Sequence, residues 1–224
     1  MIEFDADVIK LIHSELEKSF PRMEKGIIPE REPLLQSIVE KPDRILFGVE
    51  SPYQTLISKA AVMMEAITRW HVFVDGNKRT GLMTAFLYLY LNQTYLAIPI
   101  DSVRFTIKVA DNRETDPDST NELIKEITDW LKIHSTTKPI EFFGLVWIYN
   151  TWPALKLNIL YRLGFKKRVK RTLNEWYALD THPDYAEESQ ETSAFLQQVM
   201  KQATRNLFES LQTQKKSKNK TTDR

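Results

Sequence analysis

Apolar residues recur at the helical period along most of this 224-residue chain, whereas the alternation typical of strands is scarce. The segment from Asn77 to Leu91 is apolar almost all round, as in a helix buried at the centre of a bundle. The segment before it is amphipathic as far as about Trp70, with an apolar face formed by Leu56, Ala60, Met64 and Ile67. The sequence therefore predicts a mainly helical fold in which a turn at 71–76 joins two packed helices.

Capping patterns predict where some helices begin. Ser51 can cap the first of the two packed helices, with Pro52 in its first turn and Gln54 closing a capping box. Ser119 and Glu122 form the same pattern before another amphipathic segment. A first helix is expected behind Asp5, with Phe4, Val8, Ile12 and Leu16 on one face, and a short helix is expected to open at Asp101 and Ser102. Two more helices are expected in the C-terminal region: one from Pro153 to Leu163 that stops at Gly164, and a long one from about Tyr185 to Gln212.

The character of the sequence changes at a short polar linker between Ser135 and Pro139, which predicts a domain boundary. Residues 1–134 then form one domain, and residues 139–214 form a mainly helical C-terminal region. The apolar stripe of the long last helix must be covered by something, either a partner or a second copy of the chain. Residues 215–224 carry no apolar side chain and are predicted to be a disordered basic tail.

The composition of the chain limits the chemistry that it can perform and indicates the cellular compartment in which it works. The chain has no cysteine, which excludes disulfides, thiolate nucleophiles and cysteine-based metal sites, and fits a reducing compartment. Its acidic start does not resemble a secretory signal, and the run from Phe142 to Tyr149 is too short to span a bilayer. We therefore expect a cytoplasmic protein without membrane contact. A formal net charge of +1 argues against nucleic-acid binding, although basic residues cluster between Lys166 and Arg171.

One short segment concentrates chemically active residues: H-x-F-x-D-G-N-K-R, from His71 to Arg79. A helix that begins near Asn77 presents unpaired N–H groups and the positive end of its dipole to an anion such as a phosphate. Gly76 allows close backbone approach, while Lys78 and Arg79 add cationic contacts. These properties together predict a phosphate site at the turn.

The other polar residues of the segment suit catalysis and metal binding. Asp75 supplies a hard oxygen ligand of the kind that Mg²⁺ takes when it is bound to nucleotide phosphates. His71, at the end of the preceding helix, can accept a proton from an attacking hydroxyl. An ordinary polar turn with a core-facing histidine is the alternative, and Phe73 is expected to anchor the loop in the core. Seven fixed residues at this spacing would arise by chance in a chain of this length on the order of once in several million sequences.

This segment resembles the signature loop of the Fic/Doc (Fido) family, and more closely its death-on-curing branch. The residues from Phe47 and Gly48 through Lys59, Ala60 and Ala61 resemble that branch as well. The similarity covers roughly residues 1–134. It implies an all-α helical bundle with a short flap hairpin, to which the helical C-terminal region is an extension. It also implies ATP and Mg²⁺ as cofactors.

The resemblance implies a role for each residue of the loop. His71 matches the general base, Asp75 the magnesium ligand, and Asn77, Lys78 and Arg79 the contacts to nucleotide phosphates, beside Gly76 in the turn. Lys78 stands where AMP-transferring members have a glycine, and Leu82 where they have a second arginine. In the death-on-curing branch the same lysine accompanies a reversed nucleotide and protein-kinase chemistry. We therefore expect phosphorylation of a protein hydroxyl, with AMP transfer and a non-catalytic binding module as the alternatives.

The resemblance also implies partners. The target protein is expected to dock at the flap near Arg44 to Val49. The inhibitory motif of the family, Ser/Thr-x-x-x-Glu followed by Gly or Asn, is absent from this sequence, so an antitoxin-like partner is the expected means of control. The long C-terminal helix is the expected surface for pairing of two copies. His13, His134 and His182 have no second ligand at helical spacing and are expected to be structural or surface residues.

Overall fold

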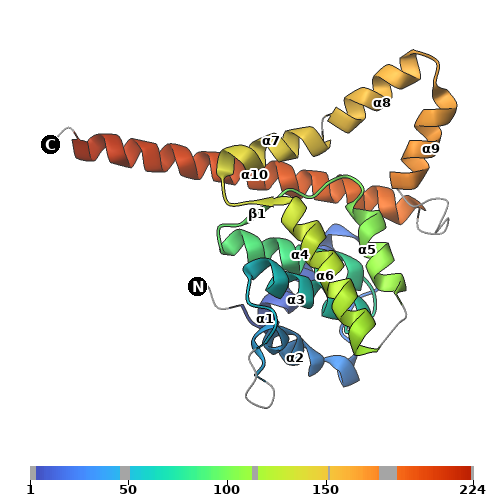
Figure 1. Cartoon of the computed structure of the whole chain (residues 1–224), viewed down its shortest axis with the longest axis vertical. Coiled ribbons are helices and arrows are strands. Elements are labelled where there is room, and N and C mark those ends of the chain that lie inside the picture. The colour runs from blue at the N-terminus through green and yellow to red at the C-terminus, as the bar shows by residue number, and fades with distance from the viewer. Residues whose placement is uncertain (1–3, 46–50, 113–115, 151, 177–185, 223–224) are drawn as a thin grey trace. The chain divides into compact units, whose positions relative to one another are not determined.

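The computed structural model describes residues 4–45, 51–112, 116–150, 152–176 and 186–222 (Figure 1). Within these ranges it contains ten α-helices, two single 3₁₀ turns and one two-stranded antiparallel sheet. This confirms the all-α prediction with a helical C-terminal extension. The chain divides into two compact units, residues 1–96 with 102–137 and residues 97–101 with 138–224.

The first unit consists of six of the α-helices and the small sheet. Its elements are α1 (Ala6–Ser19), η1 (Pro29–Arg31), α2 (Leu34–Glu40), η2 (Lys41–Asp43), α3 (Leu56–Trp70), α4 (Asn77–Leu91), β1 (Tyr95–Leu96), α5 (Ser102–Asp111), α6 (Pro117–Ile133) and β2 (Ser135–Thr136). In the sheet, Tyr95 lies opposite Thr136 and Leu96 opposite Ser135. This short ribbon joins the end of α4 to the end of α6.

Helix α3 is at the centre of this unit and packs against α4, α6, α5 and α2. Its residues from Ala60 to Thr68 are all buried, and α4 is buried on most of its circumference as its uninterrupted apolar pattern predicted. The two helices approach closely at Gly81, where a Cβ atom would lie 2.5 Å from Thr68 Oγ1 and 3.0 Å from the Met64 carbonyl oxygen. Any larger residue at this position would force the helices apart. The loop between α3 and α4 is therefore held at both ends by a tightly packed pair.

The start predicted for α3 is wrong by several residues. The helix begins at Leu56 and is capped by Thr55, whose hydroxyl accepts the Ser58 N–H at 3.0 Å in a capping box. Ser51 instead closes a local turn, because its hydroxyl accepts the Tyr53 N–H at 3.2 Å and its carbonyl accepts Gln54 Nε2 at 2.5 Å. Its capping groups are thus used before the helix starts.

The start predicted for α6 is also displaced. Asp116 is the cap, with its Oδ1 accepting the Ser119 N–H at 3.0 Å and Pro117 in the first turn. A carboxylate before a proline is a better cap than the serine within the first turn, because the helix dipole favours a negative charge at that end. Ser119 therefore lies inside the helix that it was expected to open.

Helix α1 begins where the acidic residues predicted, with Asp5 Oδ1 accepting the Val8 N–H at 3.0 Å. Its buried stripe differs from the expected one, since Ile9, His13 and Leu16 face the core. Val8 and Ile12 are half-buried at the edge of that stripe. The buried face of α1 is therefore shifted around the helix relative to the predicted one, and this shift places His13 in the core where aliphatic side chains were expected.

The predicted flap at Arg44 to Val49 lies largely outside the described residues, which omit 46–50. Arg44 follows η2 with extended backbone angles (φ −66°, ψ 123°), and Ile45 is exposed. The structure thus describes only the entry to the predicted flap.

The second unit contains α7 (Pro139–Asn150), α8 (Trp152–Arg162), α9 (Lys166–Trp176) and α10 (Ala186–Thr222). The segment 97–101 joins it through Ile98, whose N–H lies 3.3 Å from Met200 Sδ on α10. Gly164 has φ +89° after α8, which confirms it as the stop of that helix. Helix α10 continues to Thr222, so residues 215–222 are helical where the sequence predicted a disordered tail. Lys is a good helix former, and Ser, Asn and Thr can extend an existing helix at a cost of less than about 0.7 kcal/mol per residue, because extension avoids the cost of nucleation.

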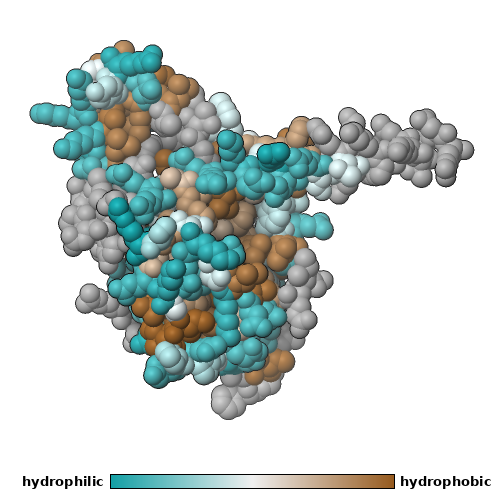
Figure 2. Space-filling view, turned by 180° about the vertical axis from the view of Figure 1, so that it is seen from behind, coloured by the Kyte–Doolittle hydropathy of each residue, from teal (hydrophilic) through white to brown (hydrophobic). Residues whose placement is uncertain are grey.

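The helical corner formed by α8 and α9 exposes both apolar and basic side chains. In Figure 2 this corner lies at the upper left, where brown apolar residues stand beside teal hydrophilic ones. The exposed apolar side chains there include Leu155, Ile159, Leu163 and Phe165. Among the described residues, no helix is both long enough and apolar enough to cross a membrane.

Candidate functional site

The segment singled out by its chemistry forms the loop between α3 and α4, here called the signature loop (residues 71–76), and the first turn of α4. An isolated antiparallel bridge between Ile27 and Phe73 connects it to the chain before η1. In that bridge the Ile28 N–H donates to the Val72 carbonyl at 2.9 Å, and the Val74 N–H donates to the Gly26 carbonyl at 3.1 Å. The loop is therefore a paired and packed element rather than an ordinary exposed turn.

His71 terminates α3 in a left-handed conformation (φ 49°, ψ 53°), and its side chain is exposed. A non-glycine residue adopts this conformation at a cost, so other contacts must hold it. Arg31 supplies them, because its Nη1 donates to the Trp70 carbonyl at 3.1 Å and to the His71 carbonyl at 3.0 Å. The backbone of His71 is thus fixed while its imidazole stays accessible, as a general base requires. Sequence reasoning did not find Arg31, which lies forty positions away.

Asn77 closes the signature loop on itself. Its Oδ1 accepts the Phe73 N–H at 3.0 Å, and its Nδ2 donates to the Phe73 carbonyl at 2.8 Å. The two residues are 7% and 1% exposed, so these hydrogen bonds are shielded from water. Phe73 is the buried anchor that the sequence predicted. Asn77, which the resemblance assigns to phosphate contact, has its side-chain amide engaged in holding the loop.

Gly76 precedes α4 with φ +75°, a conformation that favours glycine. A Cβ atom on it would lie 2.5 Å from Met23 Sδ and 3.5 Å from His13 Cε1, so the space beneath the turn is filled. Its N–H donates to Asp75 Oδ1 at 2.5 Å. Within the described residues, no side chain caps the start of α4 at this position. The positive end of the helix dipole is therefore left without a side-chain cap from the described residues, and the half-buried carboxylate of Asp75 lies beside it.

The two cations of the first turn differ in exposure. Lys78 is half-buried, whereas Arg79 is only 8% exposed. The Arg79 guanidinium carbon lies 4.3 Å from the ring centroid of Phe20, the residue that ends α1. A cation over an aromatic face is stabilised by about 0.5–2 kcal/mol, more where water is excluded. Arg79 is therefore held in place from beneath the turn, which sequence reasoning did not foresee.

The carboxylate of Asp75 could bind a metal ion that arrives with a ligand such as a nucleotide. Across the described ranges, no three or more His, Cys, Asp or Glu side chains gather in a way that could hold a metal ion. Asp75 contributes one carboxylate next to the turn that begins α4. Mg²⁺ bound to nucleotide phosphates typically uses one or two carboxylates and fills its other positions with water and phosphate oxygens. Asp75 fits that kind of ion.

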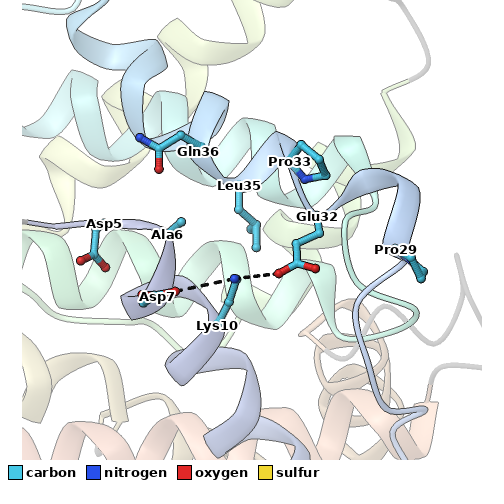
Figure 3. A pocket seen from close by; sticks show the side chains of 9 residues that line it. All are labelled: Asp5, Ala6, Asp7, Lys10, Pro29, Glu32, Pro33, Leu35 and Gln36. Atoms are coloured by element: carbon cyan, nitrogen blue, oxygen red, sulfur yellow. Dashed lines mark ion pairs between the residues drawn. The ribbon is translucent and has the colours of Figure 1, made fainter.

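A hollow in the described surface lies away from the signature loop (Figure 3). It has a volume of about 540 Å³ and lies between the start of α1, η1 and α2. Lys10 spans it, with Nζ 2.7 Å from Glu32 Oε1 and 3.6 Å from Asp7 Oδ1. These contacts raise the pKa of Lys10, chiefly through the hydrogen bond to Glu32. None of the signature-loop residues lines this hollow, so its size alone does not identify it as the site of the chemistry.

Comparison with known proteins shows what the N-terminal part of the chain is similar to. Residues 3–89 match the sequence profile of the Fic/DOC family. A curated relative, Toxin Doc of Mycolicibacterium smegmatis (strain ATCC 700084 / mc(2)155), is 38% identical over 68 residues, which cover 30% of this chain and 52% of the relative. The chain thus spans about half the length of this relative. No solved structure matches. The resemblance to the Doc-like branch is confirmed.

Proposed function

We propose that residues 1–134 form a catalytic domain that uses Mg-ATP to phosphorylate a hydroxyl side chain of a target protein. The observation that carries this proposal is the arrangement around one turn: an exposed His71 at the end of α3 and a half-buried Lys78 in the first turn of α4. Asn77 fixes the loop between them. The loop thus has the rigidity that positioning of a nucleophile and a phosphate requires.

In the proposed reaction, His71 accepts the proton of the target hydroxyl. The hydroxyl oxygen attacks the γ-phosphorus of ATP and forms the new P–O bond. The bond between the γ-phosphorus and the β,γ-bridging oxygen breaks, and ADP leaves with that electron pair. His71 then returns its proton to solvent or to the ADP phosphate. A general base of this kind contributes roughly 10²–10⁴-fold to the rate.

The phosphates are proposed to bind at the start of α4, against the turn at Gly76, with Lys78 and Arg79 supplying positive charge. Asp75 would hold the magnesium ion, which supplies charge neutralisation of the phosphate oxygens when bound. Because the Arg79 guanidinium is already fixed over Phe20, it would contribute a pre-organised field at the turn.

Lys78 supports phosphoryl transfer over AMP transfer. Its side chain occupies space and adds a charge in a turn where AMP-transferring relatives have glycine, so the nucleotide would bind with a changed phosphate register. Leu82, where those relatives have a second arginine, is buried and 2% exposed, so no cation reaches the phosphates from that position. AMP transfer, which would attack the α-phosphorus and release pyrophosphate, is the alternative.

The similarity to a protein named Toxin Doc supports a role as the toxin of a toxin–antitoxin pair. We propose that a separate antitoxin controls the chain and that the target protein docks near Arg44 to Val49. Residues 139–214 would then act as an accessory region, with α10 as the surface for a partner or a second copy. These proposals about partners do not depend on the signature loop, so they can be wrong even if the proposed reaction is right.

ATP labelled in parallel on its α- or γ-phosphate tests the proposed reaction. The full chain is incubated with cell extract and Mg²⁺, and Lys78→Gly is assayed beside the wild type. We expect label to reach protein from γ-ATP alone in the wild type. Label from α-ATP in the wild type would instead establish AMP transfer and show that Lys78 does not reverse the nucleotide. A protein that binds ATP but transfers neither label would indicate a binding module.

A further inference from the structure

Helix α1 places a buried histidine directly beneath the signature loop. His13 is 3% exposed, and its ring lies flat on that of Phe73, with centroids 3.8 Å apart and planes inclined by 15°. Its Cε1 is also the atom that a side chain on Gly76 would meet at 3.5 Å. The imidazole therefore supports both the anchor of the loop and the turn that begins α4.

The ring is also engaged by polar groups on both sides. Nδ1 lies 3.1 Å from Thr80 Oγ1, at a position in α4 that is fully buried. Nε2 lies 3.2 Å from Glu17 Oε1, one turn further along α1, a close contact without the alignment of a hydrogen bond. A neutral ring can accept the Thr80 hydroxyl proton at Nδ1 or donate from Nδ1 to the hydroxyl oxygen, depending on its tautomer. Burial lowers the pKa of His13, which keeps this neutral form near pH 7 even though Glu17 opposes the shift.

Glu17 extends the connection back to the signature loop. Its Oε1 accepts the Gly26 N–H at 2.8 Å, and the Gly26 carbonyl accepts the Val74 N–H at 3.1 Å. His13 is thus the centre of a closed path that leaves the loop at Phe73, crosses α1 and returns to it at Val74. A histidine used merely as filler in a core would need neither a paired hydroxyl nor a carboxylate on its far side.

We propose that His13 is a positioning residue: its imidazole couples α1 to the signature loop and so keeps His71 and Asp75 in the arrangement needed for transfer. The part concerning transfer rests on the proposed function. The part concerning the position of the loop does not, because it follows from contacts of Phe73, Val74 and Thr80 that are independent of the reaction.

Two variants remove the polar connection without removing bulk. His13→Phe keeps the stack on Phe73 but loses both nitrogens, and Thr80→Val replaces the hydroxyl by a methyl group of similar size. His13→Asn is the conservative variant, because its amide can reach Thr80 where Nδ1 stood. Ile9→Ala is the matched control, since Ile9 is fully buried on the same face of α1 and takes no part in the path.

The first readout is amide hydrogen exchange in the full-length protein, which does not depend on activity. Loss of one buried hydrogen bond should lower the exchange protection of the Val74 and Gly26 amides about tenfold in His13→Phe and Thr80→Val. His13→Asn should restore part of this protection. Ile9→Ala should change these amides no more than it changes the amides of α3. Equal protection in His13→Phe and wild type, or the same local loss in Ile9→Ala, would overturn the proposal.

The second readout is the rate of label transfer. In His13→Phe, kcat should fall about tenfold while KM for ATP stays within about twofold, because misplacement of a base affects turnover more than binding. The double variant His13→Phe/Thr80→Val should be no slower than the slower single variant, as expected of two residues in one path. If wild type transfers no label but loop protection responds as described, the proposed reaction fails and the positioning role stands. If wild type transfers label and His13→Phe matches it in rate and protection, the positioning role alone fails.

Discussion

Replacing Asn77 by alanine tests how the signature loop is held. The side-chain amide makes two hydrogen bonds to the Phe73 backbone, at 3.0 Å and 2.8 Å, in surroundings closed to water. Alanine leaves the Phe73 N–H and carbonyl without these partners. Each buried backbone group that loses its partner costs about 1–3 kcal/mol, so Asn77→Ala, which leaves two such groups, should lower the free energy of unfolding by about 2–6 kcal/mol.

A second asparagine on the same helix provides the matched control for Asn77→Ala. Asn92 caps the other end of α4, where its Nδ2 donates one hydrogen bond to the Tyr88 carbonyl at 2.8 Å. This side chain is half-buried and closes no loop, so Asn92→Ala should cost only about 1 kcal/mol. The comparison separates loop closure from the general loss of an asparagine in α4.

Urea unfolding followed by circular dichroism measures both variants, with linear extrapolation to water. The expected order of stability is wild type, then Asn92→Ala, then Asn77→Ala. An Asn77→Ala protein within about 0.5 kcal/mol of wild type would refute the reasoning, because it would mean that Phe73 finds other partners at no cost. Equal losses in the two variants would refute the special role of loop closure.

Three further predictions concern the same region. Gly76→Ala should destabilise the chain by about 1–3 kcal/mol, because the alanine would have to adopt a positive φ and its Cβ would clash with Met23. Adding Met23→Ala to this variant should relieve the clash but not the cost of the positive φ, as the midpoints of urea unfolding would show. Because burial lowers the pKa of His13, the native state binds a proton less readily than the unfolded chain. The free energy of unfolding should therefore fall as the pH drops below about 6.5, and His13→Gln should flatten this slope, as urea unfolding at several pH values would show. Asp75→Ala should remove the magnesium dependence of ATP binding measured by calorimetry, and an unchanged dependence would show that the ion is held elsewhere.

The central helices could be predicted from sequence because their signal is local. A helix from near Asn77 to Leu91, apolar almost all round from Leu82 onward, was predicted for α4 and has the bounds that the structure shows. Helix starts were less predictable, because several residues compete for each cap. Ser51 and Thr55 both have a capping hydroxyl, and the choice depends on where Ser51 finds other partners.

The residues proposed for the site could be picked out from the sequence of the signature loop, but the residues that support the loop could not. Arg31, His13 and Phe20 are distant from the loop in sequence and carry no motif. Each of these residues supports the loop or the start of α4 through one or two contacts, and these contacts form only when α1 and η1 pack against the loop. His13 was expected to be structural or on the surface, and its place at i+4 from Ile9 on the buried face was the only local signal.

The central claim is that His71 is the base of a phosphoryl transfer, and the rate of γ-label transfer to protein tests it most directly. His71→Ala is compared with His134→Ala, which removes a half-buried histidine at the end of α6 that is bonded to the Trp130 carbonyl. The account predicts that His71→Ala lowers the rate by roughly two to four orders of magnitude while His134→Ala retains it. Transfer by His71→Ala at the wild-type rate would contradict the account.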